Sequence, residues 1–147
     1  MSNKAESQVV ELIVGTYAQA GGAGLVRLTV RGDRLVAGTS SRDVDDASFA
    51  LWSSRHRRFY AVRELPDGAV RALAIDGDGL RVTSEAGTRG AAPCHLALDP
   101  DQQRLAVANY ESGSIALFRL GPEGQLPECP TAHLQLAGHG PNAERQE

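Results

Sequence analysis

The chain has 147 residues, of which 41% are hydrophobic and 22% charged, so it is expected to fold around one hydrophobic core rather than stay disordered. Its net charge is −3 and its basic residues are scattered, which argues against the sustained basic face of a nucleic-acid-binding protein. No apolar run approaches the roughly 18 residues that span a bilayer, so no membrane partner is expected. The N-terminus is polar and lacks the apolar core of a signal peptide. Together with only two cysteines, Cys94 and Cys129, this predicts a cytoplasmic protein with reduced thiols.

After a polar tail at residues 1–10, three apolar segments that each begin on a glycine repeat along the chain. They start at Gly24, Gly68 and Gly113, which are 44 and 45 residues apart. Each is followed by a turn and a second apolar stretch, whose leucines (Leu35, Leu80 and Leu126) are 45 and 46 apart. Two features with one period indicate a structural repeat.

The strands expected upstream of these glycines match as well. Residues 59–64 correspond to 105–110, and 49–52 correspond to 96–99. A full unit is therefore four short strands, for example 94–99, 104–110, 113–120 and 131–137, joined by turns rich in Pro and Gly. No stretch shows a sustained helical period, so the sequence predicts an all-β fold.

Four-stranded units of about 45 residues are typical of β-propeller blades, and the repeated strand order favours them over a sandwich or barrel of short strands. Blades are expected at about 11–46, 47–92 and 93–137, followed by a loop at 138–147. Residues 13–17 match the second strand of the later blades, so the first blade lacks its own first strand. Because propellers close with about four to eight blades, the chain is expected to be the N-terminal portion of a longer ring, with exposed blade edges that favour self-association.

Four segments resemble the lactonase family of seven-bladed β-propellers, which includes propeller-type 6-phosphogluconolactonases and the carboxymuconate cyclases. They are 15–17 (Gly-Thr-Tyr), 93–96 (Pro-Cys-His-Leu), 108–114 and, most specifically, 140–147 (Gly-Pro-Asn-Ala-Glu-Arg-Gln-Glu). The resemblance implies an incomplete propeller with about three of seven blades. It also implies hydrolysis of a small sugar-acid lactone, most specifically 6-phosphogluconolactone in the pentose phosphate pathway.

Lactone hydrolysis needs a base and groups that hold developing negative charge, but no metal or organic cofactor. The four histidines are distant from one another in the sequence, and no metal-ligand spacing is present. Three alternatives stay open: a non-catalytic interaction module, a cyclase-like enzyme that forms lactones, and a chain that is inactive alone.

Two residues are the candidates for catalysis. Arg145 lies in the most specific motif, and its planar guanidinium suits a phosphate or carboxylate. The neighbouring Glu144 is a candidate for substrate binding or for orienting the arginine, with a solvated surface acid as the alternative. His95 opens the first strand of the third blade, where its counterpart in the second blade is expected to be Ser48. It is a candidate base or hydrogen-bond donor, unless it ties one blade to the next.

Further substrate-binding candidates stand at the ends of second strands. Tyr17, Glu64 and Tyr110 are expected at equivalent positions in the three blades, and Asn109 precedes Tyr110. Because equivalent strand ends of a propeller meet at one rim, these side chains are expected to face a common binding site. A role in forming turns is the alternative, particularly for Asn109.

Overall fold

The structure, a computed structural model, describes residues 10–138 and 141. Within them the chain forms three antiparallel sheets, here called blades. Blade 1 contains β1 (Val10–Gly15), β2 (Leu25–Arg31) and β3 (Arg34–Ser41). Blade 2 contains β4 (Ala50–Ser53), β5 (Arg58–Arg63), β6 (Ala69–Asp76) and β7 (Gly79–Gly87). Blade 3 contains β8 (Pro93–Leu98), β9 (Arg104–Asn109), β10 (Ser114–Arg119) and β11 (Ala132–Gln135).

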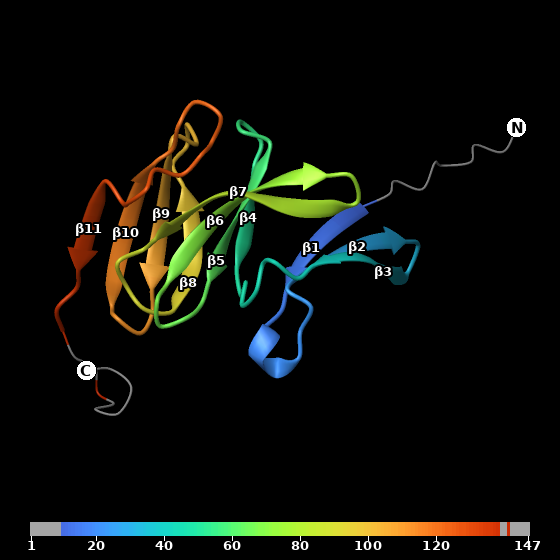
Figure 1. Cartoon of the computed structure of the whole chain (residues 1–147), viewed down its shortest axis with the longest axis horizontal. Coiled ribbons are helices and arrows are strands. Elements are labelled where there is room, and N and C mark those ends of the chain that lie inside the picture. The colour runs from blue at the N-terminus through green and yellow to red at the C-terminus, as the bar shows by residue number, and fades with distance from the viewer. Residues whose placement is uncertain (1–9, 139–140, 142–147) are drawn as a thin grey trace, which may run out of the picture.

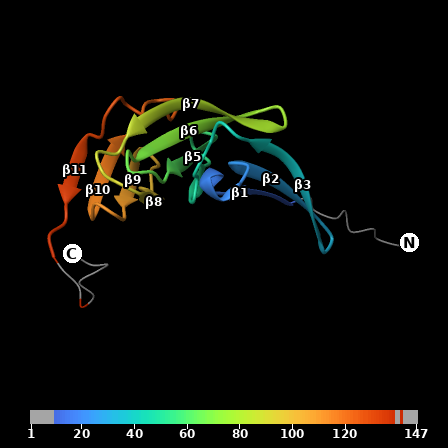
Figure 2. The ribbon, with the colours of Figure 1, turned by 60° about the horizontal axis from the view of Figure 1, so that its bottom comes forward.

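Each blade is a simple meander, because every strand pairs with its neighbours in the sequence. The blades follow one another across the molecule (Figure 1), and a tilted view shows that they lie along an arc (Figure 2). The all-β prediction is confirmed. Blade 1 has three strands where blades 2 and 3 have four, as expected from the absence of a first strand before residues 13–17.

The three repeated glycines stand where the repeat predicts, immediately before β2, β6 and β10. Gly24 and Gly113 have φ values of 80° and 57°, a left-handed conformation that glycine adopts without steric cost. A tight turn can therefore lead directly into the strand that follows. This local requirement explains why the repeat is visible in the sequence.

The hydrophobic core lies between the blades. One cluster, which includes Tyr60, Leu105 and Phe118, joins blade 2 to blade 3. A second cluster, which includes Leu25 and Leu73, joins blade 1 to blade 2. Strand faces buried on both sides explain why the middle blade carries a nearly continuous buried run in β6.

The third leucine of the repeat, Leu126, differs from Leu35 and Leu80 in its setting, because those two lie in β3 and β7. Leu126 lies between β10 and β11, outside any strand, and only 7% of it is exposed. Its backbone N–H donates to Ser84 Oγ at 3.0 Å, and its side chain joins the core between blades 2 and 3. The leucine therefore recurs for its packing, and the last strand of blade 3, Ala132–Gln135, lies within the expected 131–137.

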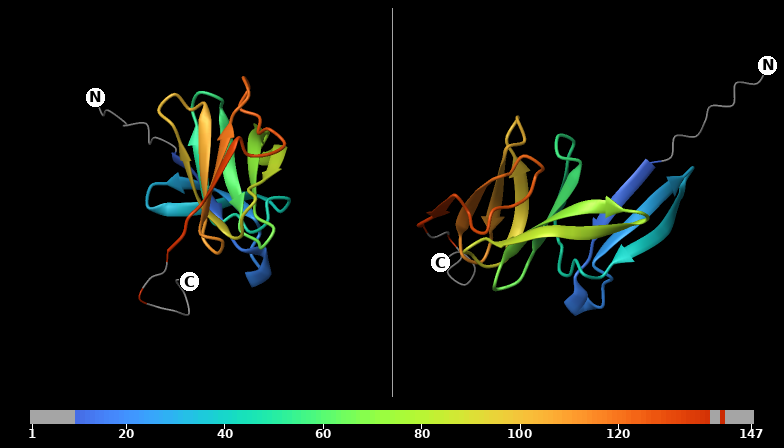
Figure 3. Two further views of the ribbon diagram at one scale, coloured as in Figure 1. Left: turned by 90° about the vertical axis from the view of Figure 1, so that its left-hand side faces the viewer. Right: turned by 45° about the horizontal axis from the view of Figure 1, so that its top comes forward.

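Side chains and loops also tie neighbouring blades together. The β6–β7 hairpin reaches toward the strands of blade 1 (Figure 3), where the Leu80 N–H donates to Ser41 Oγ at 3.0 Å. Between blades 2 and 3, the buried Tyr60 hydroxyl donates to the Gly124 carbonyl at 2.7 Å. In the described part of the chain, no helix has the length and hydrophobicity to span a bilayer.

Candidate functional site

One rim of the arc gathers most of the residues that the sequence singled out. Because neighbouring strands are antiparallel, the ends of β1, β5 and β9 lie on the same side as the starts of β4 and β8. Glu64 directly follows β5, and Tyr110 directly follows β9. Tyr17 is the second residue after β1, immediately before the short 3-10 helix η1 (Ala18–Ala20). This edge is called the rim below.

At the rim, the structure brings Tyr17 of blade 1 into contact with Glu64 of blade 2. The Tyr17 hydroxyl donates to Glu64 Oε2 at 2.9 Å, and 46% of Tyr17 is exposed. The two residues are 47 positions apart. A carboxylate that is already bonded to one donor keeps further acceptor sites, so the pair can accept hydrogen bonds from a hydroxyl-rich ligand.

The expected equivalence of Tyr17 with Glu64 and Tyr110 is off by one residue. Gly15 pairs with Leu25 as Arg63 pairs with Ala69 and as Asn109 pairs with Ser114. The equivalent of Glu64 and Tyr110 is therefore Thr16, whose hydroxyl donates to the Gly24 carbonyl at 2.8 Å. Tyr17 reaches Glu64 because the chain continues from Thr16 into η1.

The surroundings of Tyr17 favour its protonated form. The hydrogen bond to Glu64, followed by partial burial and by the negative charge of Glu64, raises the pKa of Tyr17 above its ordinary value of 10.0. The Ser48 hydroxyl acts in the opposite direction, although its geometry falls short of a full hydrogen bond. At neutral pH Tyr17 is therefore a hydrogen-bond donor held on a carboxylate.

His95 lies in β8 and is exposed. Its ring packs against the ring of Phe49, with centroids 4.4 Å apart and planes tilted by 39°. The strand register makes Phe49 the counterpart of His95, since Ala50 pairs with Ala61 as Leu96 pairs with Val107. The expectation that Ser48 is the counterpart is wrong by one residue. The first strands of blades 2 and 3 are separated in the sequence by the same number of residues as the second strands with which they pair.

Asn109 and Tyr110 are separated by their environments. Asn109 is 2% exposed, and its side-chain amide donates to Ser114 Oγ at 3.1 Å inside blade 3. Tyr110 is 64% exposed, and its backbone N–H donates to the Ala92 carbonyl at 2.9 Å. Only Tyr110 presents its side chain to solvent. Arg145 and Glu144 lie outside the described residues.

Two residues at the rim, Ser48 and Asp46, are not predicted from the sequence to belong to the site. Ser48 carries a buried hydroxyl that makes no hydrogen bond to the rest of the described chain. Asp46 is 3% exposed and adopts a φ of 49°. Neither residue belongs to a motif, and both lie in the connection between blades 1 and 2, so only the fold shows that they adjoin Tyr17 and Glu64.

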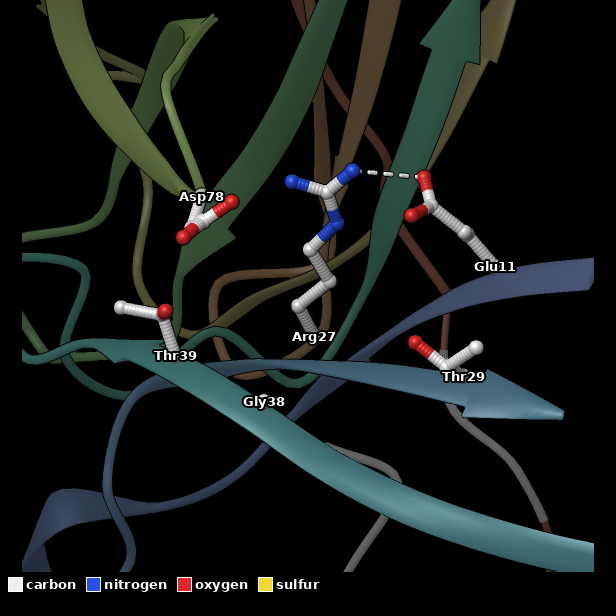
Figure 4. Close-up of a pocket in the computed structure, with 6 residues that line it drawn as sticks. All are labelled: Glu11, Arg27, Thr29, Gly38, Thr39 and Asp78. Atoms are coloured by element: carbon white, nitrogen blue, oxygen red, sulfur yellow. Dashed lines mark hydrogen bonds and ion pairs between the residues drawn. The ribbon is translucent and has the colours of Figure 1, made fainter. Parts of the chain in front are cut away.

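A separate polar hollow of about 190 Å³ lies between blade 1 and the β6–β7 turn. Arg27 crosses it, donating to Glu11 Oε2 at 2.6 Å and to the Gly77 carbonyl at 3.4 Å. Figure 4 shows Asp78 facing the arginine from the opposite side, with Thr29 and Thr39 below. None of the residues expected at the site lines this hollow, and its contacts tie blade 1 to blade 2.

A larger and more apolar hollow of about 440 Å³ lies between β1 and blade 2. Leu12 and Ile13 line it from blade 1, and Trp52 and Phe59 line it from blade 2. The Trp52 ring packs on Phe59 at 4.7 Å between centroids. Over residues 10–138 and 141, no group of three or more His, Cys, Asp or Glu side chains is placed to hold a metal ion.

Comparison with known proteins identifies the architecture. The family model "Lactonase, 7-bladed beta-propeller" matches residues 11–147. The 6-phosphogluconolactonase of Bacillus subtilis is 26% identical over 139 residues, which are 91% of this chain and 39% of that protein.

Solved structures agree on the fold. A candidate 6-phosphogluconolactonase from Bacteroides fragilis aligns with 98% of this chain at a TM-score of 0.86 and 25% identity. The periplasmic gluconolactonase of Pseudomonas aeruginosa aligns with 86% of it at a TM-score of 0.77 and 20% identity. The chain spans 41% and 39% of these two structures, so it corresponds to part of a propeller ring.

Proposed function

Because the chain belongs to the lactonase family of seven-bladed β-propellers, we propose that the protein it forms part of hydrolyses a sugar-acid lactone, with 6-phosphogluconolactone as the substrate. The observation that carries this proposal is the contact between Tyr17 and Glu64, which joins two blades at one rim. The name of the Bacillus subtilis relative supports the choice of substrate. Cytoplasmic pentose phosphate metabolism is part of the proposal.

The chemistry asks for few groups. Hydrolysis adds water across the acyl C–O bond of the ring: the water oxygen bonds to the acyl carbon while a base takes one of its protons. The bond from the acyl carbon to the ring oxygen then breaks, and the base returns the proton to that oxygen, which leaves as a hydroxyl. General-base assistance of this kind contributes roughly 10²–10⁴-fold to a rate. No step requires an oxidant, a reductant or a second substrate.

We assign the residues by what they present to solvent. Glu64 accepts hydrogen bonds from sugar hydroxyls. Tyr17 and Tyr110 offer the substrate their exposed rings and hydroxyl groups. His95 is the candidate for proton transfer, since it is exposed on the first strand of blade 3. Arg145, with Glu144 beside it, is proposed to hold the anionic end of the substrate. Asn109 is left out of the binding set because its amide is enclosed within blade 3.

The test is a titrimetric assay of lactone hydrolysis by the protein expressed from its complete reading frame. The Glu64→Gln substitution removes the carboxylate charge but keeps the shape of the side chain. A hydrogen bond to a charged group contributes about 1.5–3 kcal/mol, so KM for 6-phosphogluconolactone should rise about tenfold to hundredfold while kcat changes little.

The matched control is Glu128→Gln, an exposed glutamate between β10 and β11, at the edge of blade 3 opposite the rim. It should leave both constants unchanged. The proposal fails if the protein does not accelerate lactone hydrolysis above the spontaneous rate, or if the Glu64 variant matches the control.

We also propose that the 147-residue chain on its own self-associates and hydrolyses lactones poorly. In the described residues β1 pairs with β2 alone, so its other edge carries unpaired N–H and C=O groups. Val10, Leu12 and Val14 of this strand are 44%, 41% and 41% exposed. An open apolar edge favours pairing with another chain.

A further inference from the structure

The connection between β3 and β4 runs between blades 1 and 2 (Figure 1). Val44, Asp46 and Ala47 within it are 0%, 3% and 0% exposed. Buried backbone and carboxyl groups need partners, and the partners of Asp46 are both at the rim.

Asp46 is hydrogen-bonded to the backbone of Glu64 and to the backbone of the residue that follows Tyr17. Its side-chain Oδ1 accepts a hydrogen bond from the N–H of Ala18, the residue after Tyr17, at 3.0 Å. Its carbonyl accepts a hydrogen bond from the Glu64 N–H at 2.9 Å. One residue thus fixes the chain on either side of the contact between the Tyr17 hydroxyl and Glu64 Oε2.

We propose that Asp46 is a positioning residue for the contact between Tyr17 and Glu64, which binds the substrate. Asp46 sets this contact because it holds the two backbone segments that carry Tyr17 and Glu64. The proposal rests on the assignment of this pair as the binding site. Asp46 itself does not face the ligand, because it is nearly fully buried.

Both neighbouring blades contact the connection closely. Arg71, which is 9% exposed, donates through Nη1 to the Asp43 carbonyl at 3.0 Å and to Asp45 Oδ1 at 2.6 Å. The end of β1 presses on the connection, since a Cβ on Gly15 would lie 1.6 Å from the Ala47 carbonyl oxygen. The residues on either side of Asp46 are therefore held by blade 2 at Asp45 and by blade 1 at Ala47.

The residue type suits the position. With φ at 49°, Asp46 is in the left-handed region, which Asn, Asp and Gly tolerate better than other residues. Asn keeps both the conformation and an acceptor oxygen. Gly keeps the conformation but removes the acceptor, so the two substitutions separate the side-chain bond from the backbone.

The experiment follows Tyr17 directly, with tyrosine labelled at Cζ with ¹³C in the protein expressed from its complete reading frame and the Tyr17 signal assigned from Tyr17→Phe. Asp46→Gly should lower the pKa of Tyr17 toward 10.0, its ordinary value, because the bond to Glu64 is no longer maintained. Asp46→Asn should leave it raised. The groups near this phenol are Glu64, Ser48 and Cys94, and none is altered by either substitution.

A second variant removes the same bond from the other side. Ala18→Pro deletes the N–H that donates to Asp46, and proline fits the first position of a short helix after an extended residue; Tyr17 has a ψ of 120°. It should reproduce the effect of Asp46→Gly. Asp33→Gly, in the exposed turn between β2 and β3, is the matched control and should leave the Tyr17 signal unchanged.

In the hydrolysis assay, Asp46→Gly and Ala18→Pro should raise KM at least tenfold while Asp46→Asn stays near the parent value. The proposal is overturned if both Asp46→Gly and Ala18→Pro keep the raised pKa of Tyr17. If these variants lower that pKa without changing KM, positioning stands and the assignment of the pair to substrate binding fails.

Discussion

Gly15 at the end of β1 offers the sharpest test of how blade 1 is seated. A Cβ at this position would lie 1.6 Å from the carbonyl oxygen of Ala47 and 2.8 Å from its carbonyl carbon. Both contacts are with backbone, so no side chain can rotate away. Relief requires β1 and the connection before β4 to separate by more than an ångström.

Overpacking of a well-packed interior costs about 1–3 kcal/mol, and occasionally more. Because backbone faces backbone here, we expect Gly15→Ala to lower the free energy of unfolding by about 3 kcal/mol, a large part of the roughly 5–15 kcal/mol of a typical domain. The matched control is Gly87→Ala, where a Cβ meets nothing within 4 Å. In that strand, alanine should be neutral or stabilising by up to about 1 kcal/mol.

The assay is urea unfolding of the 147-residue chain, followed by the fluorescence of Trp52, which is the single tryptophan of this chain. Trp52 lines the same hollow as Leu12 and Ile13 of β1, so its emission reports the docking of blade 1 on blade 2. If Gly15→Ala and Gly87→Ala unfold at the same urea concentration with the same slope, the close seating of β1 on the connection is refuted.

Two further predictions concern blade 2 and the open edge. Tyr60→Phe removes the buried hydrogen bond to the Gly124 carbonyl and should cost about 1–3 kcal/mol, because the acceptor loses its partner. Burial raises the pKa of Tyr60 to about 12, against the opposing charge of Arg58. The native state therefore resists ionisation of this phenol. The free energy of unfolding of the parent should fall as pH rises from 10 to about 12, and that of Tyr60→Phe should fall less. Equal losses of unfolding free energy in urea titrations at alkaline pH would contradict this. Leu12→Lys places a charge on the exposed β1 and should shift the 147-residue chain toward monomer in light scattering, whereas an unchanged mass would show that this edge does not carry the self-association.

The sequence predicts those features that local chemistry imposes. The glycines at 24 and 113 mark strand starts because their turns need a left-handed backbone. Gly68 marks one because a Cβ there would lie 2.6 Å from the Gly90 carbonyl oxygen. The phase of the repeat also predicts the three strands of blade 1 that the described residues form. Leu126 keeps the spacing of the repeat although it packs from a loop, so the spacing alone does not tell a loop leucine from a strand leucine.

The site is less accessible from sequence than the strands. The sequence predicts Tyr17 and Glu64 at one rim. It also gives Tyr17 the register that belongs to Thr16, and it makes Ser48 the counterpart of His95. Both assignments differ by one residue from the observed strand pairing. The period of the repeat does not determine the register of paired strands to within one residue. Asp46 gives no local signal, because its function arises from bonds to Ala18 and Glu64 that only the docking of two blades creates.

The central claim is that Tyr17 and Glu64 act together on a lactone. The most direct measurement is a double-mutant cycle on kcat/KM for 6-phosphogluconolactone, with Tyr17→Phe, Glu64→Gln and the combined variant in the protein from its complete reading frame. Side chains in contact typically couple by about 0.5–3 kcal/mol, so the combined loss should be clearly smaller than the product of the single losses. Losses that multiply, or single variants that match the parent, would contradict the account.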